Sequence, residues 1–340
     1  TSTPTSGATF TVDNTAPTIS AVTQVVTPSN DTTPSYVFTT NETGTVTTNI
    51  GAGIDSGGTV TSTGENTVTF NTLAPGTYAD KTITLTDAAG NTSSLTLVTF
   101  VIDTTAPTAA ITYNSVSPYK NGDTVTITAT FNGPVADSPV PTIAIAGSGI
   151  ANVASTNMTK TSTTVYTYSY AVPTGDGTGT VTVGTGQDAA GNVVTSTPTS
   201  GATFTVDNTA PTGAITYSAD GPYKQGATAT VTATFTEALT TTPKIAISGV
   251  STVVATNMSG SGTTWTYAYT APAGDGTDTF AFSVGTDAAG NTVTSAPTSG
   301  ATVTVDNTAP TMTIESTTAG VSDGSTTNDS SIVLKFTSSE

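Results

Sequence analysis

Apolar and polar residues alternate in short runs along nearly the whole chain, and no stretch shows the period of an α-helix. In the first hundred residues these runs are separated by Gly, Asn, Asp or Pro. They predict strands near residues 18–26, 34–40, 44–49, 59–63, 66–72, 78–86 and 93–102. Seven short strands in about 90 residues are typical of an antiparallel sandwich of the immunoglobulin type. The pattern therefore predicts an all-β chain.

One segment, Asp-Asn-Thr-Ala-Pro-Thr, recurs at 13–18, 207–212 and 306–311, with a near copy at 103–108. Its proline fixes φ and favours extended geometry in the preceding alanine, as expected of a stiff connector. A spacing of about 100 residues is the usual size of a domain, so we expect a tandem array of seven-stranded immunoglobulin-like sandwiches forming an extended rod. The predicted units are 1–12 (last strand of a preceding repeat), 13–102, 103–206, 207–305 and 306–340 (start of a further, incomplete repeat).

The two ends of the chain carry orphan strands in this division. Residues 1–18 are identical to residues 195–212, so residues 1–12 are expected to be the final strand of an earlier repeat. One interpretation is a segment of a longer repetitive protein. The other is strand exchange between chains, with Phe10 and Val12 against Val333 and Phe336 of another molecule.

The composition excludes several function classes. Six lysines, no arginine and 23 acidic residues give a net charge of −17, which disfavours binding to nucleic acid or to anionic membrane surfaces. No apolar run reaches the length of a membrane span. Cysteine and histidine are absent, which removes disulfides, the usual zinc sites and the serine–histidine triad. We therefore expect no enzyme activity.

The acidic residues fall at one end of each predicted sandwich. In an immunoglobulin-like order, the incoming linker, the loop between the second and third strands (the BC loop) and the hairpin between the last two strands (the FG turn) meet at the same end. The FG turns are the Asp-Ala-Ala-Gly-Asn segments at 87–91, 188–192 and 287–291. The acids expected to meet are Asp13, Glu42 and Asp87 in the first repeat, and Asp207, Glu237 and Asp287 in the third.

Two further sets are incomplete. The second repeat supplies Asp103 and Asp188 but has Gly133 in place of the glutamate, and the terminal segment supplies Asp306 and Glu340. Gathered carboxylates repel one another unless a hard cation lies between them. Calcium accepts six to eight carboxylate and carbonyl oxygens, whereas magnesium prefers a stricter octahedron with retained water, so calcium is the favoured cofactor at the junctions.

Two alternatives qualify this prediction. The Asp-Ala-Ala-Gly-Asn segment is also an ordinary turn in which the aspartate binds its own backbone, and both interpretations can hold together. The Gly-Asp-Gly loops at Asp176 and Asp275 face the next linker and are weaker candidates for lending oxygens to the following metal. Gly-Asp-Gly is itself a common turn.

An aromatic row in the second and third repeats permits another function. Tyr166, Tyr168 and Tyr170 align with Trp265, Tyr267 and Tyr269. On an exposed face such a row would favour a carbohydrate-binding module. Core packing is the preferred interpretation, because the chain is poor in leucine and needs large apolar side chains inside.

The linkers, the FG turns and the Phe38-to-Glu42 and Phe235-to-Glu237 segments resemble the bacterial immunoglobulin-like repeats of giant calcium-binding cell-surface adhesins and related secreted repeat proteins. The resemblance covers nearly the whole chain and implies an extracellular or cell-surface rod whose junctions are stiffened by calcium. Its partners would be neighbouring repeats of the same chain and other copies of itself.

The function expected from this resemblance is that of a non-catalytic spacer, a stalk segment that sets distance and stiffness. At about 3.3 Å per strand residue, three sandwiches in line would exceed about 100 Å. A self-assembling filament, sheath or surface-layer subunit is the alternative, since a threonine-rich surface of low charge density permits close lateral packing. A carbohydrate-binding array is less favoured.

Overall fold

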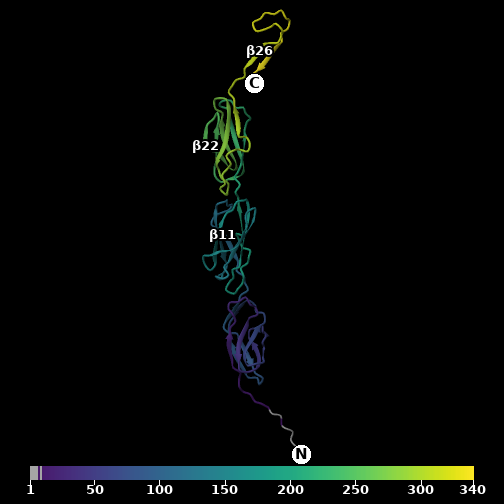
Figure 1. Cartoon of the computed structure of the whole chain (residues 1–340), viewed down its shortest axis with the longest axis vertical. Helices are drawn as coiled ribbons and strands as arrows, with labels where there is room; N and C mark the ends of the chain where they lie inside the picture. The colour runs from purple at the N-terminus through teal and green to yellow at the C-terminus, as the bar shows by residue number, and fades with distance from the viewer. Residues whose placement is uncertain (1–6, 8–9) are drawn as a thin grey trace, which may run out of the picture. The chain divides into compact units, whose positions relative to one another are not determined.

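The computed structural model describes residue 7 and residues 10–340, and it is all-β, with no helix in that part of the chain (Figure 1). Most of the strand expected within residues 1–12 lies outside the described residues. Two compact units are present. One comprises the described residues up to Val116 with Asn121–Val206, and the other Ser117–Lys120 with Asp207–Glu340.

The first repeat is a sandwich of two four-stranded sheets with a short extra ladder. One sheet has the order β1-β2-β6-β4, the other β5-β3-β8-β9, and β10 pairs with β7. All these pairs are antiparallel. The strands are β1 (Ile19–Thr23), β2 (Ser35–Thr40), β3 (Gly44–Thr48), β4 (Ile54–Ser56), β5 (Thr59–Val60), β6 (Gly64–Phe70), β7 (Gly76–Tyr78), β8 (Thr82–Thr86), β9 (Thr92–Thr96) and β10 (Phe100–Ile102).

The second repeat also has two sheets, in the orders β11-β12-β16-β15 and β14-β13-β17-β18. Its first strand follows directly on the linker, as in the first repeat. The strands are β11 (Ala109–Tyr113), β12 (Thr124–Phe131), β13 (Thr142–Ser148), β14 (Val153–Asn157), β15 (Thr159–Lys160), β16 (Val165–Ala171), β17 (Gly177–Gly184) and β18 (Thr203–Val206).

The third repeat has the sheet orders β19-β20-β23 and β22-β21-β24-β25, and the terminal segment forms a two-stranded ladder of β26 and β27. Strand β20 is long and carries a register shift between Thr234 and Leu239. The strands are β19 (Gly213–Tyr217), β20 (Thr228–Leu239), β21 (Pro243–Ser248), β22 (Val253–Asn257), β23 (Ser259–Thr270), β24 (Gly276–Val284), β25 (Thr302–Val305), β26 (Met312–Ser316) and β27 (Leu334–Ser338).

The sandwich prediction is confirmed, but the strand count differs between repeats. Seven strands describe the third repeat, whereas the second has eight and the first ten. In the first repeat the run predicted at 78–86 divides into β7 and β8, because Asp80 takes a positive φ of 54° and interrupts the ladder. Strand β4 is additional, because Ile54–Ser56 has too few residues to show a period.

Each repeat has its own hydrophobic core between its sheets. Buried residues of the first repeat form one cluster from Val25 to Ile102, and those of the third form another from Ile215 to Val305. The alternation seen in the sequence is the cause, since Tyr36 and Phe38 on β2 point inward while their neighbours face outward. Full burial of each such side chain contributes about 1.5–3 kcal/mol.

The aromatic row belongs to these cores. Tyr166 and Tyr170 on β16 are buried, as are Trp265 and Tyr269 on β23. The open aromatic face that a carbohydrate-binding module would need is therefore absent at this row, and the core-packing interpretation is confirmed.

The second and third cores differ at one matched pair of positions. In the second repeat Gly179 lies opposite Phe204, whose ring occupies the space that a Cβ at residue 179 would need. The corresponding third-repeat pair is Asp278 opposite Val303, and Asp278 is fully buried. Its carboxylate accepts hydrogen bonds from the Tyr269 hydroxyl at 2.8 Å and the Ser251 N–H at 2.5 Å. The aspartate thus fills the space that an aromatic ring fills in the second repeat.

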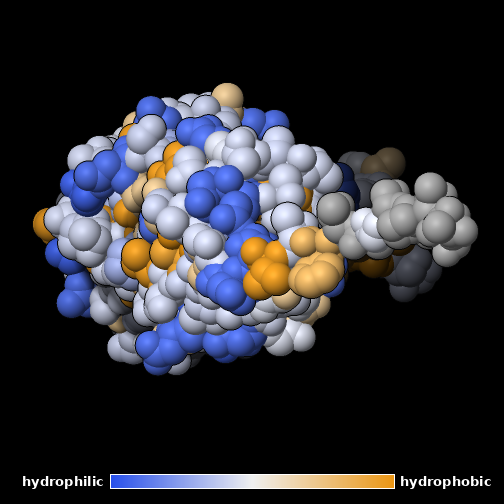
Figure 2. Space-filling view, turned by 90° about the horizontal axis from the view of Figure 1, so that it is seen from below, coloured by the Kyte–Doolittle hydropathy of each residue, from blue (hydrophilic) through white to orange (hydrophobic). Residues whose placement is uncertain are grey.

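The surface is polar but not densely charged. Figure 2 shows a face that is mostly pale, with scattered hydrophilic groups and small hydrophobic areas between them. This agrees with a chain in which only 9% of residues are charged, and threonine, serine and glycine cover the solvent-facing side of the strands.

Candidate metal centre

The FG turns of all three repeats share one internal hydrogen bond, from the N–H of the closing asparagine to Oδ1 of the aspartate. In the first, Oδ1 of Asp87 accepts hydrogen bonds from the N–H groups of Ala89 at 2.8 Å and Asn91 at 2.9 Å. The Gly90 N–H binds the Asp87 carbonyl, and Gly90 takes the positive φ of 95° that this turn requires. The turn interpretation is therefore correct, and one face of the carboxylate is fixed by its own loop.

The asparagine that closes each turn ties it to the incoming linker. The Asn91 amide donates to Oδ2 of Asp87 at 2.8 Å and to the carbonyl oxygen of Asp13 at 3.2 Å. The amide hydrogen bond lowers the pKa of Asp87 below its usual value, with further help from the turn's N–H groups. Asn192 and Asn291 make the same two bonds in the later repeats, to Asp103 and Asp207 of their linkers.

The linker aspartates form a second small turn. Oδ1 of Asp13 accepts the N–H of Thr15 at 2.9 Å, and Asp103, Asp207 and Asp306 repeat this bond to the threonine two residues on. This bond holds the linker aspartate's side chain in place and leaves Oδ2 for another partner.

One side chain near the end of the second strand accepts a hydrogen bond from a linker N–H and so joins that strand to the linker. We call this contact the stitch and its residue the stitch residue. Oδ1 of Asn41 accepts the N–H of Thr18 at 2.6 Å, and Oγ1 of Thr236 accepts the N–H of Thr212 at 3.1 Å. Each stitch residue immediately precedes the predicted glutamate. Glu42 follows β2 in the BC loop as expected, whereas Glu237 lies within β20, because this strand runs on to Leu239.

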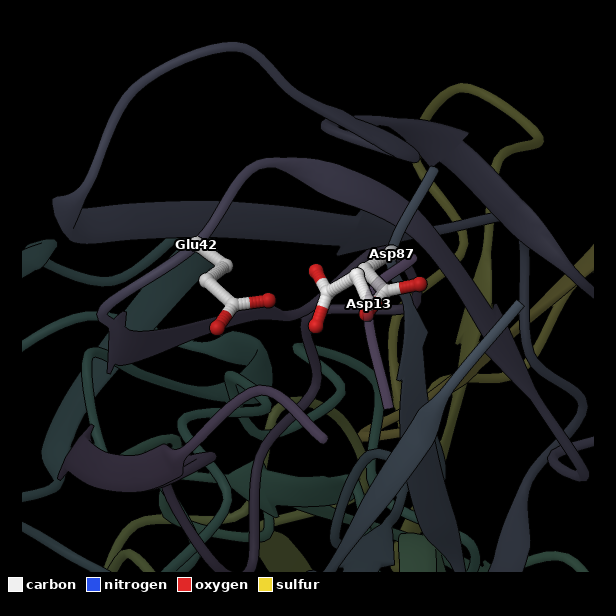
Figure 3. A group of neighbouring side chains, drawn as sticks. All are labelled: Asp13, Glu42 and Asp87. Carbon is white, nitrogen blue, oxygen red and sulfur yellow. The ribbon is translucent and has the colours of Figure 1, made fainter. Parts of the chain in front are cut away.

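These elements bring the predicted acids together in two repeats. Oxygens of Asp13, Glu42 and Asp87 lie within 4.8 Å of one another, and so do oxygens of Asp207, Glu237 and Asp287. Within the described part of the chain these are the two groups of three or more such side chains. Figure 3 shows Asp13 and Asp87 side by side with the Glu42 carboxylate turned toward them. The first group lines an open hollow together with Thr43, Thr63 and Ala88.

The electrostatics of three converging carboxylates favour a cation. Carboxylates whose oxygens lie within 4.8 Å of one another repel, and the repulsion grows where solvent is excluded. Asp287 is only 2% exposed, so solvent screens its charge incompletely, whereas Asp13 of the first group is exposed. The donors are all hard oxygens, with no nitrogen or sulfur ligand, a set that suits calcium or magnesium and not zinc.

The second repeat keeps every part of this arrangement except the third acid. Asp188 and Asp103 hold their turn bonds, and Asn132 makes the stitch to Thr108 at 2.9 Å. The next residue is Gly133, and a Cβ built there meets nothing within 4 Å. In the terminal segment Ser339 stitches to Thr311 at 2.9 Å and Glu340 follows it, with Asp306 at the linker.

Asp275 of the Gly-Asp-Gly loop accepts hydrogen bonds from the linker that follows it. Oδ1 accepts the Asn307 N–H at 2.5 Å and Oδ2 accepts the Thr308 hydroxyl at 2.8 Å. These bonds, the Asn307 N–H first, lower the pKa of Asp275. The carboxylate thus holds the outgoing linker. Asp176 occupies the matching position in the second repeat and is exposed.

The residues that position the acids were not predicted as a set. They are the FG-turn asparagines Asn91, Asn192 and Asn291, and the stitch residues Asn41, Asn132, Thr236 and Ser339. Their signal was available, since each stands at a fixed place in the repeat and carries a short hydrogen-bonding side chain.

Comparisons with known proteins agree with the fold. The family described as bacterial Ig-like domain (group 3) matches residues 263–337, a range that begins in β23 and ends in β27. No curated protein matches the chain in sequence. No helix among the described residues has the length and apolar character needed to cross a membrane.

Solved structures with a similar arrangement have low sequence identity to this chain. A crystal structure of titin domains covers 86% of this chain and 99% of its own, at 12% identity and a TM-score of 0.33. A putative membrane anchored protein from Corynebacterium diphtheriae covers 86% and 91%, at 14% identity and a TM-score of 0.25. Domains 4–9 of the surface layer protein SbsC match over 88% of this chain and 48% of their own, at 15% identity and a TM-score of 0.23. The sheets of this chain make it a tandem array of immunoglobulin-like sandwiches, and residues 263–337 match a bacterial Ig-like domain.

Proposed function

We propose that the chain is a non-catalytic spacer of a bacterial cell-surface or secreted repeat protein, and that calcium binds at its interdomain junctions. The observation that carries the proposal is the recurrence of one three-carboxylate group at the same place in two repeats. A catalytic centre is rarely repeated every hundred residues, whereas a joint must be.

The proposed role of calcium follows from where its ligands come from. Asp207 belongs to the linker, Glu237 to β20 and Asp287 to the FG turn, so an ion bound to all three would tie the linker to one strand and one turn of the sandwich. Backbone carbonyls near these residues would complete six to eight oxygens. The linker would then have less conformational freedom than hydrogen bonds alone leave it.

The expected stabilisation is modest. Extracellular calcium sites have dissociation constants near 10⁻⁴ to 10⁻³ M, so calcium at about 1 mM adds roughly 0.4 to 1.4 kcal/mol. That is enough to stiffen a joint without making the fold depend on the metal, since each repeat already buries its own core.

Calorimetry and small-angle scattering of the full chain test the proposal. Calorimetry should detect calcium binding. The scattering profile should indicate a stiffer array with calcium than without it, and a chelator should reverse this change. Absence of calcium binding at millimolar concentration would contradict the proposed metal site. A scattering profile that calcium leaves unchanged would contradict the proposed stiffening. The same profiles report lateral assembly into filaments or sheaths through the apparent mass.

A further inference from the structure

One position in each repeat lies at the boundary to the next. The residues Ser29, Tyr119 and Tyr223 accept, through their carbonyl oxygens, the N–H of the linker aspartates Asp103, Asp207 and Asp306 at 2.8–2.9 Å. The residue that directly follows is Asn30, Lys120 and Lys224 in turn. We call it the joint residue.

In the first compact unit the joint residue contacts the next FG turn. The Asn30 N–H donates to the carbonyl oxygen of Ala190 at 3.0 Å. Its side chain lies beside Gly191, so that a Cβ at residue 191 would be 3.5 Å from the Asn30 amide nitrogen. The neutral residue Asn30 therefore contacts the FG turn of the second repeat, which has two acids, Asp103 and Asp188.

In the second compact unit the equivalent contact is made by a cation. The Lys120 Nζ donates to the Gly290 carbonyl oxygen at 2.6 Å, one residue along the same turn motif. Gly290 follows Asp287 by three residues in a turn whose ends lie within about 7 Å. The ammonium thus contacts the same turn that carries Asp287, one of the three acids in the cluster formed by Asp207, Glu237 and Asp287.

The charge of the joint residue follows the number of acids in the next repeat. Asn30 precedes the repeat with Gly133, and Lys120 precedes the repeat with Glu237. The third joint residue, Lys224, precedes a segment in which this sequence supplies two acids, Asp306 and Glu340, so the charge comparison rests on the first two joints. A single divalent cation would bring both the asparagine joint and the lysine joint to a formal charge of zero.

We infer that the FG turn is a docking surface for the joint residue of the preceding repeat, and that the charge of this residue is matched to the acids of the repeat it meets. Docking of Lys120 restrains the linker without any metal. Only the charge balance rests on the proposed calcium site.

Pulsed electron paramagnetic resonance on the full chain tests this inference in the presence of chelator. The chain has no cysteine, so spin labels attach only at introduced sites, and Thr163→Cys with Thr252→Cys places them on exposed positions of the second and third repeats. Wild type should give a narrow distance distribution. Lys120→Gln should broaden it roughly twofold, because the linker regains freedom when the docked ammonium is lost.

Two variants keep the test specific. Lys120→Arg retains charge and donor and should stay narrow, and Lys224→Gln, the same change one repeat later, should leave this distance unchanged. A distance distribution for Lys120→Gln as narrow as that of wild type would overturn the docking.

A double variant tests the charge matching. Lys120→Asn with Glu237→Gly copies the first joint, and its distance distribution should be narrower than that of Lys120→Asn alone. Additive effects of the two substitutions would overturn the charge matching.

Calcium is absent from all these samples. A failed calcium titration therefore leaves the docking result intact, and a failed docking test leaves the proposed metal site intact.

Discussion

The entrances to the second and third repeats are built from the same parts and differ in one acid. Both have a linker aspartate in its own small turn, an FG turn closed by asparagine, and a stitch from the second strand to the linker. The third then adds Glu237, where the second has Gly133. The scaffold therefore forms without a full set of carboxylates, because hydrogen bonds alone are sufficient to build it.

This difference separates two roles that a single repeat would not distinguish. Hydrogen bonds place the linker, whereas at the proposed calcium site the number of acids would set the affinity for the cation. The cores show a similar exchange, with Gly179 and Phe204 in one repeat and Asp278 and Val303 in the other.

The largest expected effect is in the core. Gly179→Asp should destabilise the second repeat by about 3 kcal/mol or more, because the Phe204 ring occupies the space and the new carboxylate is buried. Adding Phe204→Val should recover most of this loss, since the Tyr170 hydroxyl, which has no hydrogen-bond partner among the described residues, could then donate to the aspartate. Urea unfolding measures both variants, and a double variant no more stable than Gly179→Asp would contradict the account.

The acid difference should be convertible in both directions. Glu237→Gly should weaken calcium binding at the third repeat by roughly tenfold to a hundredfold, through loss of one charged ligand. Gly133→Glu should strengthen binding at the second by a similar factor, because a side chain there meets open space. Calorimetric titration of the full chain measures these changes.

The control for this pair is Glu315→Gln, which removes an exposed carboxylate on β26, outside the two three-acid groups. Its calcium affinities should equal those of wild type. Equal affinities at the second and third repeats of the unaltered chain would contradict the assignment of Glu237 as a ligand.

The convergence of the acids could be predicted because it depends on topology alone. An immunoglobulin-like order brings linker, BC loop and FG turn to one end, and this is sufficient to predict that Asp207, Glu237 and Asp287 meet. Burial of Tyr166 and Trp265 followed in the same way from the need for large side chains in a core with little leucine.

Features that depend on local backbone or on packing partners could not be predicted. The break at Asp80 arises from one residue with positive φ, and the long β20 places Glu237 in a strand instead of a loop. The bonds of Asp275 to Asn307 and Thr308 join residues more than 30 positions apart, so no local pattern reveals them.

A smaller effect is expected at the bond that both entrances share. Asn291→Ala removes the amide that joins the Asp287 carboxylate to the Asp207 carbonyl, and should cost about 1 to 2 kcal/mol in unfolding free energy. Asn192→Ala should cost about as much in the second repeat, since its bonds are the same. Asn14→Ala in the exposed linker is the matched control. An effect in the third repeat alone would show that the shared scaffold differs between them.

The smallest effect is a dependence on pH at the outgoing linker. Hydrogen bonds lower the pKa of Asp275 in the folded chain below the unbonded value of 3.8. Its contribution to stability is therefore complete above pH 3.8 and is lost as the pH falls through the lowered pKa of the folded state. Asp275→Asn should flatten the acid limb of the stability curve below about pH 4, and an unchanged slope would contradict these bonds.

Asp207, Glu237 and Asp287 are proposed to share one calcium ion. A crystal structure of the full chain grown in millimolar calcium, with anomalous data, decides whether they do. One anomalous peak is expected, with an oxygen of each carboxylate at about 2.3–2.6 Å from it. The same three carboxylates in place around a water molecule, with no anomalous peak between them, would contradict it.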